Sequence, residues 1–136
     1  MEVLSKEKIV EPIIKKITAG YRQQASAYEE LLHLSEKQHS LVSAKEIYKL
    51  AELHQQKTEI LEKIAEEEGG LKKLQDDMVR ALNLESFSIS ELKKELSNPS
   101  VDELYKTLVD LGHIVKRAEQ AEAENEENLK KILHKK

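Results

Sequence analysis

Three acidic residues each stand three positions before a histidine, and this spacing could in principle support metal chemistry. The pairs are Glu30 with His33, Glu36 with His39, and Asp110 with His113. Di-iron helical bundles hold their metal with carboxylates and histidines at such a spacing. The heptad phase of the chain, however, turns these side chains toward water and leaves only His39 near the flank of the buried face. We therefore expect no metal site.

His54 and Lys57 are the other candidates for chemistry, because the heptad phase places both at inward positions. A carboxylate that could join His54 as a ligand on the same helix face is two helical turns away, so a metal or acid-base role is not expected. We expect instead a polar notch, that is, a short polar interruption of the apolar packing in the hairpin. The sequence also contains no glycine-rich phosphate loop, HExxH pair or nucleophile motif. We expect neither an enzyme nor a cofactor.

Composition restricts the possible partners. The 136 residues include 22 basic and 26 acidic ones, mixed along the chain, so no basic face for nucleic acid is expected. The absence of cysteine excludes disulfides and thiolate zinc sites and suits a reducing compartment. Neither a signal peptide nor the roughly 18 apolar residues of a membrane span is recognisable. We expect a cytoplasmic protein without membrane insertion.

Apolar residues recur at steps of three and four, and only four Gly and two Pro interrupt them, so helices are expected and strands are not. Pro12 is tolerated best at the first helical position, so the first helix should start near Glu11 or bend there after a short preceding turn. Gly69 and Gly70 form a weak point inside one continuous helix. The three heptad series occupy residues 10–42, 47–82 and 101–115.

Three serines each precede a glutamate by three positions, which is the spacing of a capping box at a helix start. The pairs are Ser43 with Glu46, Ser88 with Glu91, and Ser100 with Glu103. They predict a turn near residues 40–43, a short helix around residues 89–96, and a last helix that opens at Ser100.

These elements predict a single all-α domain over residues 1–136. The first two helices should each run about thirty to forty residues, or about 45 to 60 Å. The short turn between them requires a long antiparallel hairpin. A third long helix should pack along the hairpin in a coiled-coil-like bundle, because no helix can bury its apolar stripe alone. Residues 83–100 form the second connection and hold the short helix.

The C-terminal segment, residues 118–136, is expected to be packed less firmly. Its inward positions Ala118, Glu122 and Asn125 contribute little apolar area. An apolar patch then returns near the terminus, made of Leu129, Ile132 and Leu133. Two interpretations stay open: the patch packs on the hairpin or in a homodimer, or it engages a partner protein.

Four stretches of the chain resemble FlgN-type flagellar export chaperones. They are Tyr28 to Leu32, Leu41 to Ala44, Thr58 to Ile64, and Asn125 to Leu129. The resemblance implies a cytoplasmic chaperone that binds the C-terminal helical regions of the hook-filament junction (hook-associated) proteins. It also implies that the protein prevents their premature assembly and delivers them to the flagellar type III export gate, without ATP or metal.

In that family the last helix carries much of the client binding, which implies contacts at Asn125, Asn128, Leu129 and Ile132. With the apolar patch and the small residues of the same segment, the predicted partner-binding residues are Ala118, Ala121, Asn125, Asn128, Leu129, Ile132 and Leu133. The alternative function is a structural coiled-coil subunit that acts only by self-association.

Overall fold

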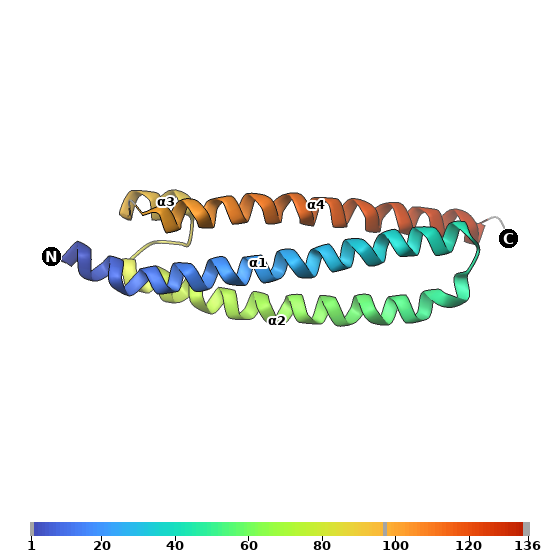
Figure 1. The fold of residues 1–136 in the computed structure, drawn as a ribbon, viewed down its shortest axis with the longest axis horizontal. Helices are drawn as coiled ribbons and strands as arrows, with labels where there is room; N and C mark the ends of the chain where they lie inside the picture. Colours follow the sequence, from blue (N-terminus) through green and yellow to red (C-terminus); the bar gives the residue numbers. More distant parts are fainter. Residues whose placement is uncertain (1, 97, 135–136) are drawn as a thin grey trace.

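Three long helices and one short helix make up the computed structural model, which describes residues 2–96 and 98–134 (Figure 1). The long helices are α1 (Glu2–Ser43), α2 (Leu50–Leu82) and α4 (Pro99–His134). The short helix α3 (Ile89–Glu95) lies in the second connection, and one 3-10 turn, η1 (Ile47–Lys49), precedes α2. The chain runs up, down and up again, so α4 is parallel to α1. The predicted all-α hairpin with a third helix along it is confirmed.

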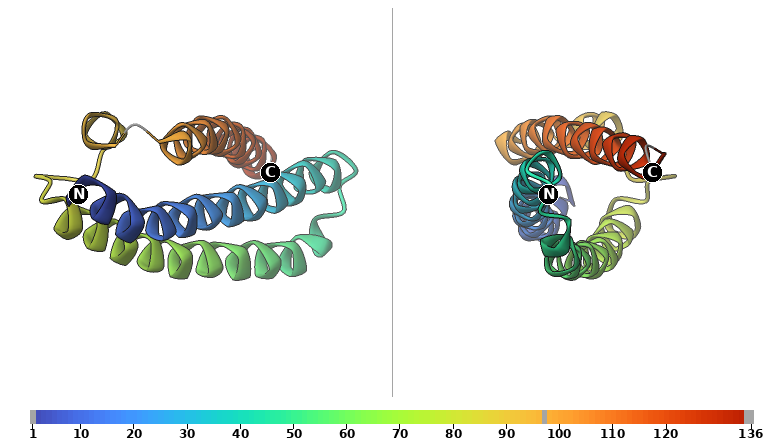
Figure 2. Two further views of the ribbon diagram at one scale, coloured as in Figure 1. Left: turned by 60° about the vertical axis from the view of Figure 1, so that its left-hand side comes forward. Right: turned by 90° about the vertical axis from the view of Figure 1, so that its right-hand side faces the viewer.

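Helix α1 is the centre of the arrangement. Both α2 and α4 pack closely along it, whereas the backbones of α2 and α4 stay farther apart from each other. Figure 2 shows α1 at the corner between the other two long helices when the bundle is seen along its axis. The neighbouring residues Ile17 and Thr18 are both buried, so the buried face of α1 is wider than a single seam. That width lets α1 contact two partners at once.

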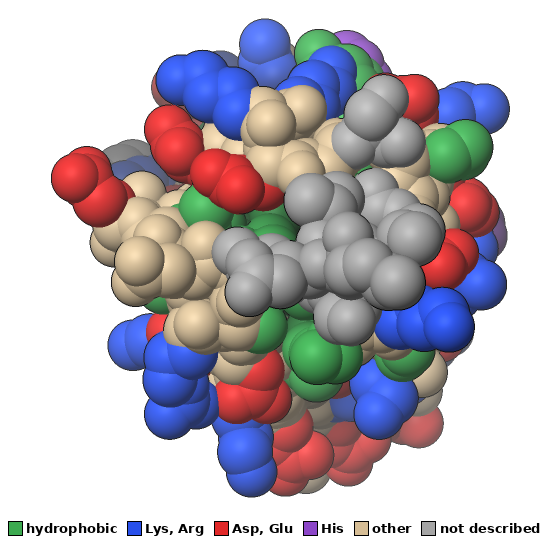
Figure 3. All heavy atoms as spheres, turned by 90° about the vertical axis from the view of Figure 1, so that its left-hand side faces the viewer, with side chains coloured by type: hydrophobic (Ala, Val, Ile, Leu, Met, Phe, Trp, Pro, Cys, Tyr) green, Lys and Arg blue, Asp and Glu red, His purple; other side chains and the backbone are tan. Residues whose placement is uncertain are grey.

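The main apolar core lies at the end of the bundle where α1 begins. Residues from α1, α2 and α4 meet there with Leu92 of α3 and Leu96, which follows it. Figure 3 views this end and shows side chains of both charge signs around it. The buried members of the core are Val10, Ile14, Ile17, Leu71, Met78, Leu82, Leu92, Leu96, Val101 and Leu104.

The first helix starts earlier than the sequence suggested. Helix α1 begins at Glu2 and contains Pro12, which excludes a start near Glu11, one of the two alternatives that the sequence left open. Proline removes one backbone donor from a helix interior. Val10 and Ile14 on either side of Pro12 are fully buried in the core, and their packing outweighs that loss.

The turn after α1 is a Schellman motif rather than a capping box. Lys45 adopts a left-handed conformation with φ of 60°, and the Glu46 amide donates to the Leu41 carbonyl at 2.8 Å. Because that amide already closes the end of α1, it cannot bond the Ser43 hydroxyl as a new helix start. The predicted box of Ser43 and Glu46 is therefore wrong, and α2 begins only at Leu50.

The other two predicted helix starts have different outcomes. The Glu91 amide donates to the Ser88 hydroxyl at 3.1 Å, which confirms Ser88 as the cap of α3. Helix α4 is capped two residues earlier than expected, by the Asn98 side chain, which accepts from the Ser100 amide at 2.9 Å. Pro99 then takes the first helical position, where its missing donor is harmless.

Gly69 and Gly70 lie inside the continuous helix α2, as predicted, and neither has a positive φ. A Cβ added at either position meets no atom within 4 Å. Each Gly in a helix interior is about 1 kcal/mol less favourable than Ala. Replacing both with Ala should therefore raise the free energy of unfolding by about 2 kcal/mol in a urea titration.

Gly20→Ala is the matched control for this prediction. A Cβ at Gly20 would lie 2.6 Å from Cδ2 of Leu71, where α1 and α2 pack closely. The crowding should cancel or exceed the gain in helix propensity, so Gly20→Ala should not stabilise the protein. A loss of stability in the Gly69 and Gly70 double variant would contradict the continuous helix.

Candidate partner-binding groove

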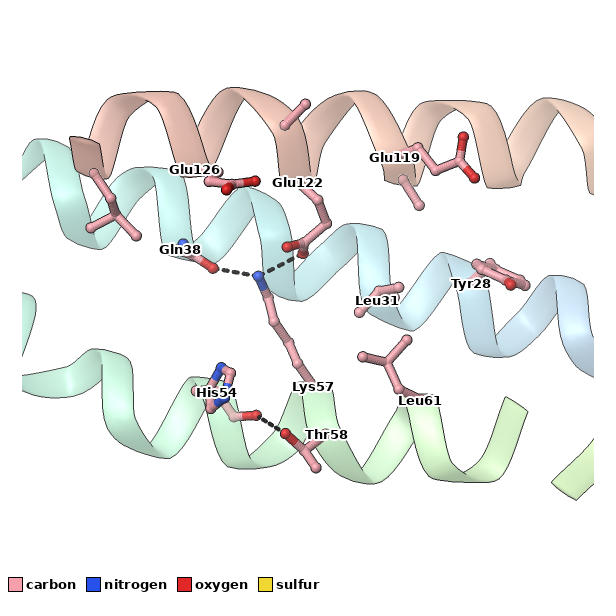
Figure 4. Close-up of a pocket in the computed structure, with 13 residues that line it drawn as sticks. Tyr28, Leu31, Gln38, His54, Lys57, Thr58, Leu61, Glu119, Glu122 and Glu126 are labelled. Atoms are coloured by element: carbon pink, nitrogen blue, oxygen red, sulfur yellow. Dashed lines mark hydrogen bonds and ion pairs between the residues drawn. The ribbon is translucent and has the colours of Figure 1, made fainter. Parts of the chain in front are cut away.

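A groove with a volume of about 690 Å³ lies between α2 and α4, and α1 forms its floor (Figure 4). Its lining combines apolar side chains with charged and polar ones. Among the described helices, none is long and apolar enough to cross a bilayer. The lining residues are Tyr28, Leu31, Gln38, His54, Lys57, Thr58, Leu61, Ala118, Glu119, Glu122, Ala123, Glu126 and Leu129.

The groove exists because α4 packs against α1 and leaves one face of α2 uncovered. Leu61 occupies an inward heptad position of α2, yet 51% of its surface is exposed. His54, which was also expected to point inward, is exposed as well, so that prediction is wrong. An apolar side chain at an inward position without a neighbour indicates that this part of the bundle lacks one helix.

A polar bridge crosses the groove and consists of Gln38, Lys57 and Glu122. The Lys57 Nζ lies 2.6 Å from a Glu122 carboxylate oxygen and also donates to the Gln38 side chain (Figure 4). The Lys57 side chain is only 7% exposed, and burial of an ammonium group is costly unless such partners surround it. The polar notch predicted at Lys57 is thus filled by a carboxylate from α4.

Helix α4 is also held to α1 by polar contacts next to this bridge. The buried Asn125 side chain donates to the Ser35 carbonyl at 2.7 Å. The buried Ser35 hydroxyl contacts the Glu122 carboxylate and the Leu31 carbonyl. Each hydrogen bond contributes only about 0.5 to 1.5 kcal/mol net, because the same groups bond water when they separate.

Tyr28 marks one end of the groove. Burial, and to a lesser extent the carboxylates of Glu68 and Glu119, raise the pKa of its phenol above the ordinary value of 10.0. The phenol is therefore neutral at physiological pH. Glu68 comes from α2 and Glu119 from α4, so negative charge stands on both walls at this end.

The sequence model of the FlgN protein family matches residues 13–135. The chain belongs to the FlgN family. Proteins of this family are chaperones of flagellar export. A search of the curated proteins and a search of the solved structures each returned no match. The matched range includes every residue that lines the groove of this FlgN-family protein.

The predicted partner-binding residues of this FlgN-family chain are spread over several environments. Ala118 and Leu129 line the groove, although Ala118 is almost fully buried. Ala121 and Asn125 lie beside a second hollow that is also lined by Ser35 of α1. The Asn128 side-chain nitrogen lies 3.5 Å from Nδ1 of His39. Ile132 is half-buried, and the side chain of Leu133 lies outside the described part of the structure.

Sequence reasoning missed part of the groove. Tyr28, Leu61, Glu119, Ala123 and Glu126 line it but were not predicted as partner-binding residues. One feature of the sequence pointed to the groove. Three successive inward heptad positions of the second helix are occupied by the polar His54 and Lys57 and then by the apolar Leu61. Two polar positions in succession indicate a face that a neighbouring helix does not fully cover.

The three acid and histidine pairs have no role in the groove. Their six side chains are exposed, including His39, which the heptad phase had placed near the flank of the buried face. Where ion pairing occurs it is local: His33 lies 3.9 Å from Glu36 within the same helix. Among residues 2–96 and 98–134, no three His, Asp or Glu side chains are close enough to hold a metal ion together.

Proposed function

We propose that this protein is a cytoplasmic export chaperone for the hook-filament junction proteins. It binds their C-terminal helical regions, prevents their premature assembly, and delivers them to the flagellar type III export gate. The observation that carries the proposal is the match of the FlgN family to residues 13–135.

The structure supports a binding role through the way α4 is attached. The half of α4 that contains Glu122 and Asn125 is fixed by hydrogen bonds to Ser35 of α1 and by one ion pair to Lys57 of α2. The hydrogen bonds among these contacts exchange with water or with a partner's polar groups at a small net change in free energy. The segment of residues 118–136, which we predict to be held less firmly than the apolar core, can therefore rearrange around a client.

Two partly exposed apolar side chains in this segment support the same role. Leu129 lines the groove and Ile132 follows one turn later, half-buried. A client helix that covers these side chains gains the apolar burial that α2 does not provide. Junction proteins supply such helices in their C-terminal regions, as the family implies.

Deletion of the gene in the bacterium that encodes it tests the proposal. Secretion of the junction proteins into the medium should fall to background, while other exported flagellar proteins stay at their normal level. A plasmid copy of the gene should restore secretion. Unchanged secretion of the junction proteins in the deletion strain would contradict the proposed function.

A further inference from the structure

The groove between α2 and α4 has the length of a short helix. Along α1 its lining runs from Tyr28 to Gln38, and along α4 from Ala118 to Leu129. At about 1.5 Å per residue these stretches span about 15 Å, or about three helical turns. One amphipathic helix laid along α1 would therefore fill the groove and complete a four-helix bundle at this end.

The apolar part of the groove lies along its middle. Leu31 on the floor is buried, whereas Leu61 on the α2 wall and Leu129 on the α4 wall remain partly exposed. Ala118 and Ala123 add small side chains on the α4 wall, which leaves room for larger side chains from an occupant. This lining fits a helix with Leu, Ile or Val at steps of three and four.

The α4 wall carries a row of carboxylates at steps of three and four, made of Glu119, Glu122 and Glu126. Lys57 supplies an ammonium group to the lining, but this group already forms an ion pair with Glu122. Glu126 has Lys130 at 3.6 Å, but both side chains are well exposed. Glu119 stands at the Tyr28 end, where Glu68 on α2 adds a further carboxylate. The rim of the groove is thus negative.

We propose that the groove binds one client helix whose apolar stripe faces Leu61 and Leu129 and whose Lys and Arg residues border that stripe on the side of α4. This inference rests on the proposed chaperone function and adds the class of client segment that fits. Charge complementarity selects the occupant, because an acidic helix would meet Glu119 and Glu126 and be repelled. In the complex, the ion pair with Glu122 still balances the charge of Lys57 beneath the bound helix.

Two synthetic helical peptides test the inference with the full-length protein in a fluorescence anisotropy titration. Both carry the same leucine stripe, and one has Lys residues beside it where the other has Glu. The Lys peptide should bind at least about tenfold more tightly at low salt, and the difference should shrink as ionic strength rises. Equal affinity of the two peptides would overturn the inference.

Variants of the groove locate the binding. Leu61→Gln should weaken binding of the Lys peptide about tenfold, whereas Val109→Gln, an exposed apolar position of α4 outside the groove, should not. Glu119→Lys should weaken the Lys peptide and strengthen the Glu peptide. A merely structural role of Glu119 would not reverse the preference. Unchanged affinities in both groove variants would overturn the inference.

The same variants separate this inference from the proposed function. If junction proteins bind the unmodified protein, and Leu61→Gln and Glu119→Lys bind them equally well, the function stands and the groove is rejected. If the Lys peptide binds in the groove but no junction protein does, the groove stands and the function is rejected. Sedimentation that shows a dimer dissolved by Leu61→Gln would make a second copy of the chain the occupant and overturn the inference.

Discussion

Leu104→Ala is expected to lower the free energy of unfolding by about 2 to 5 kcal/mol. Leu104 has 0% of its surface exposed and lies in the core that joins α1, α2, α4 and the α3 region. Truncation removes apolar burial and leaves a cavity, because close-packed neighbours relax only in part. Urea denaturation of the two proteins measures the difference.

Leu61→Ala makes the same chemical change at an exposed site and is the control. Because about half of the Leu61 surface is already in water, its loss should cost about 1 kcal/mol or less. Comparable losses at Leu104 and Leu61 would contradict the placement of the core at the end where α1 begins, and would place Leu61 in a packed interior instead.

Replacing both Leu129 and Ile132 with Asp is expected to weaken binding of a junction protein by about 100-fold or more. A buried Leu or Ile contributes about 1.5 to 3 kcal/mol, and each 1.4 kcal/mol changes an affinity tenfold. Both residues lie far along α4 from the core cluster, whose last member in that helix is Leu108. Binding should therefore be lost while the far-ultraviolet spectrum and the melting temperature change little.

Tyr105 and Val109 provide a matched double control for this variant. They are exposed apolar residues of the same helix, four positions apart, and neither lines the groove. Their replacement with Asp should leave binding intact. Undiminished binding in the Leu129 and Ile132 variant would reject this segment as the contact site. A large drop in its melting temperature would instead show that the two residues hold the bundle together.

The helical architecture was predictable from sequence because heptad phase depends on local spacing alone. The unbroken phase across Gly69 and Gly70 correctly indicated one continuous helix. Helix ends were harder to predict, because competing hydrogen bonds decide them. The Glu46 amide could serve either the Ser43 hydroxyl or the end of α1, and only the folded turn shows that it bonds Leu41. The sequence left two alternatives open at Pro12, because it does not reveal the core packing around that residue.

The groove was less predictable than the fold. Heptad phase assigns Leu61 and His54 to the buried side of α2, but it does not say whether α4 will cover that side. The position of α4 depends on the width of the buried face of α1 and on single polar contacts such as Asn125 with Ser35. The prediction that Lys57 forms a polar notch was close to the finding, but its partner Glu122 comes from a helix far away in sequence.

Titration of the full-length protein with the purified C-terminal helical region of a hook-filament junction protein tests the central claim most directly. Calorimetry should show saturable binding of one client chain to one protein chain, with a Kd of about 1 μM or below, equivalent to about −8 kcal/mol. Absence of binding at about 100 μM of each component would contradict the chaperone function. A stable homo-oligomer under those conditions would favour the structural coiled-coil subunit instead.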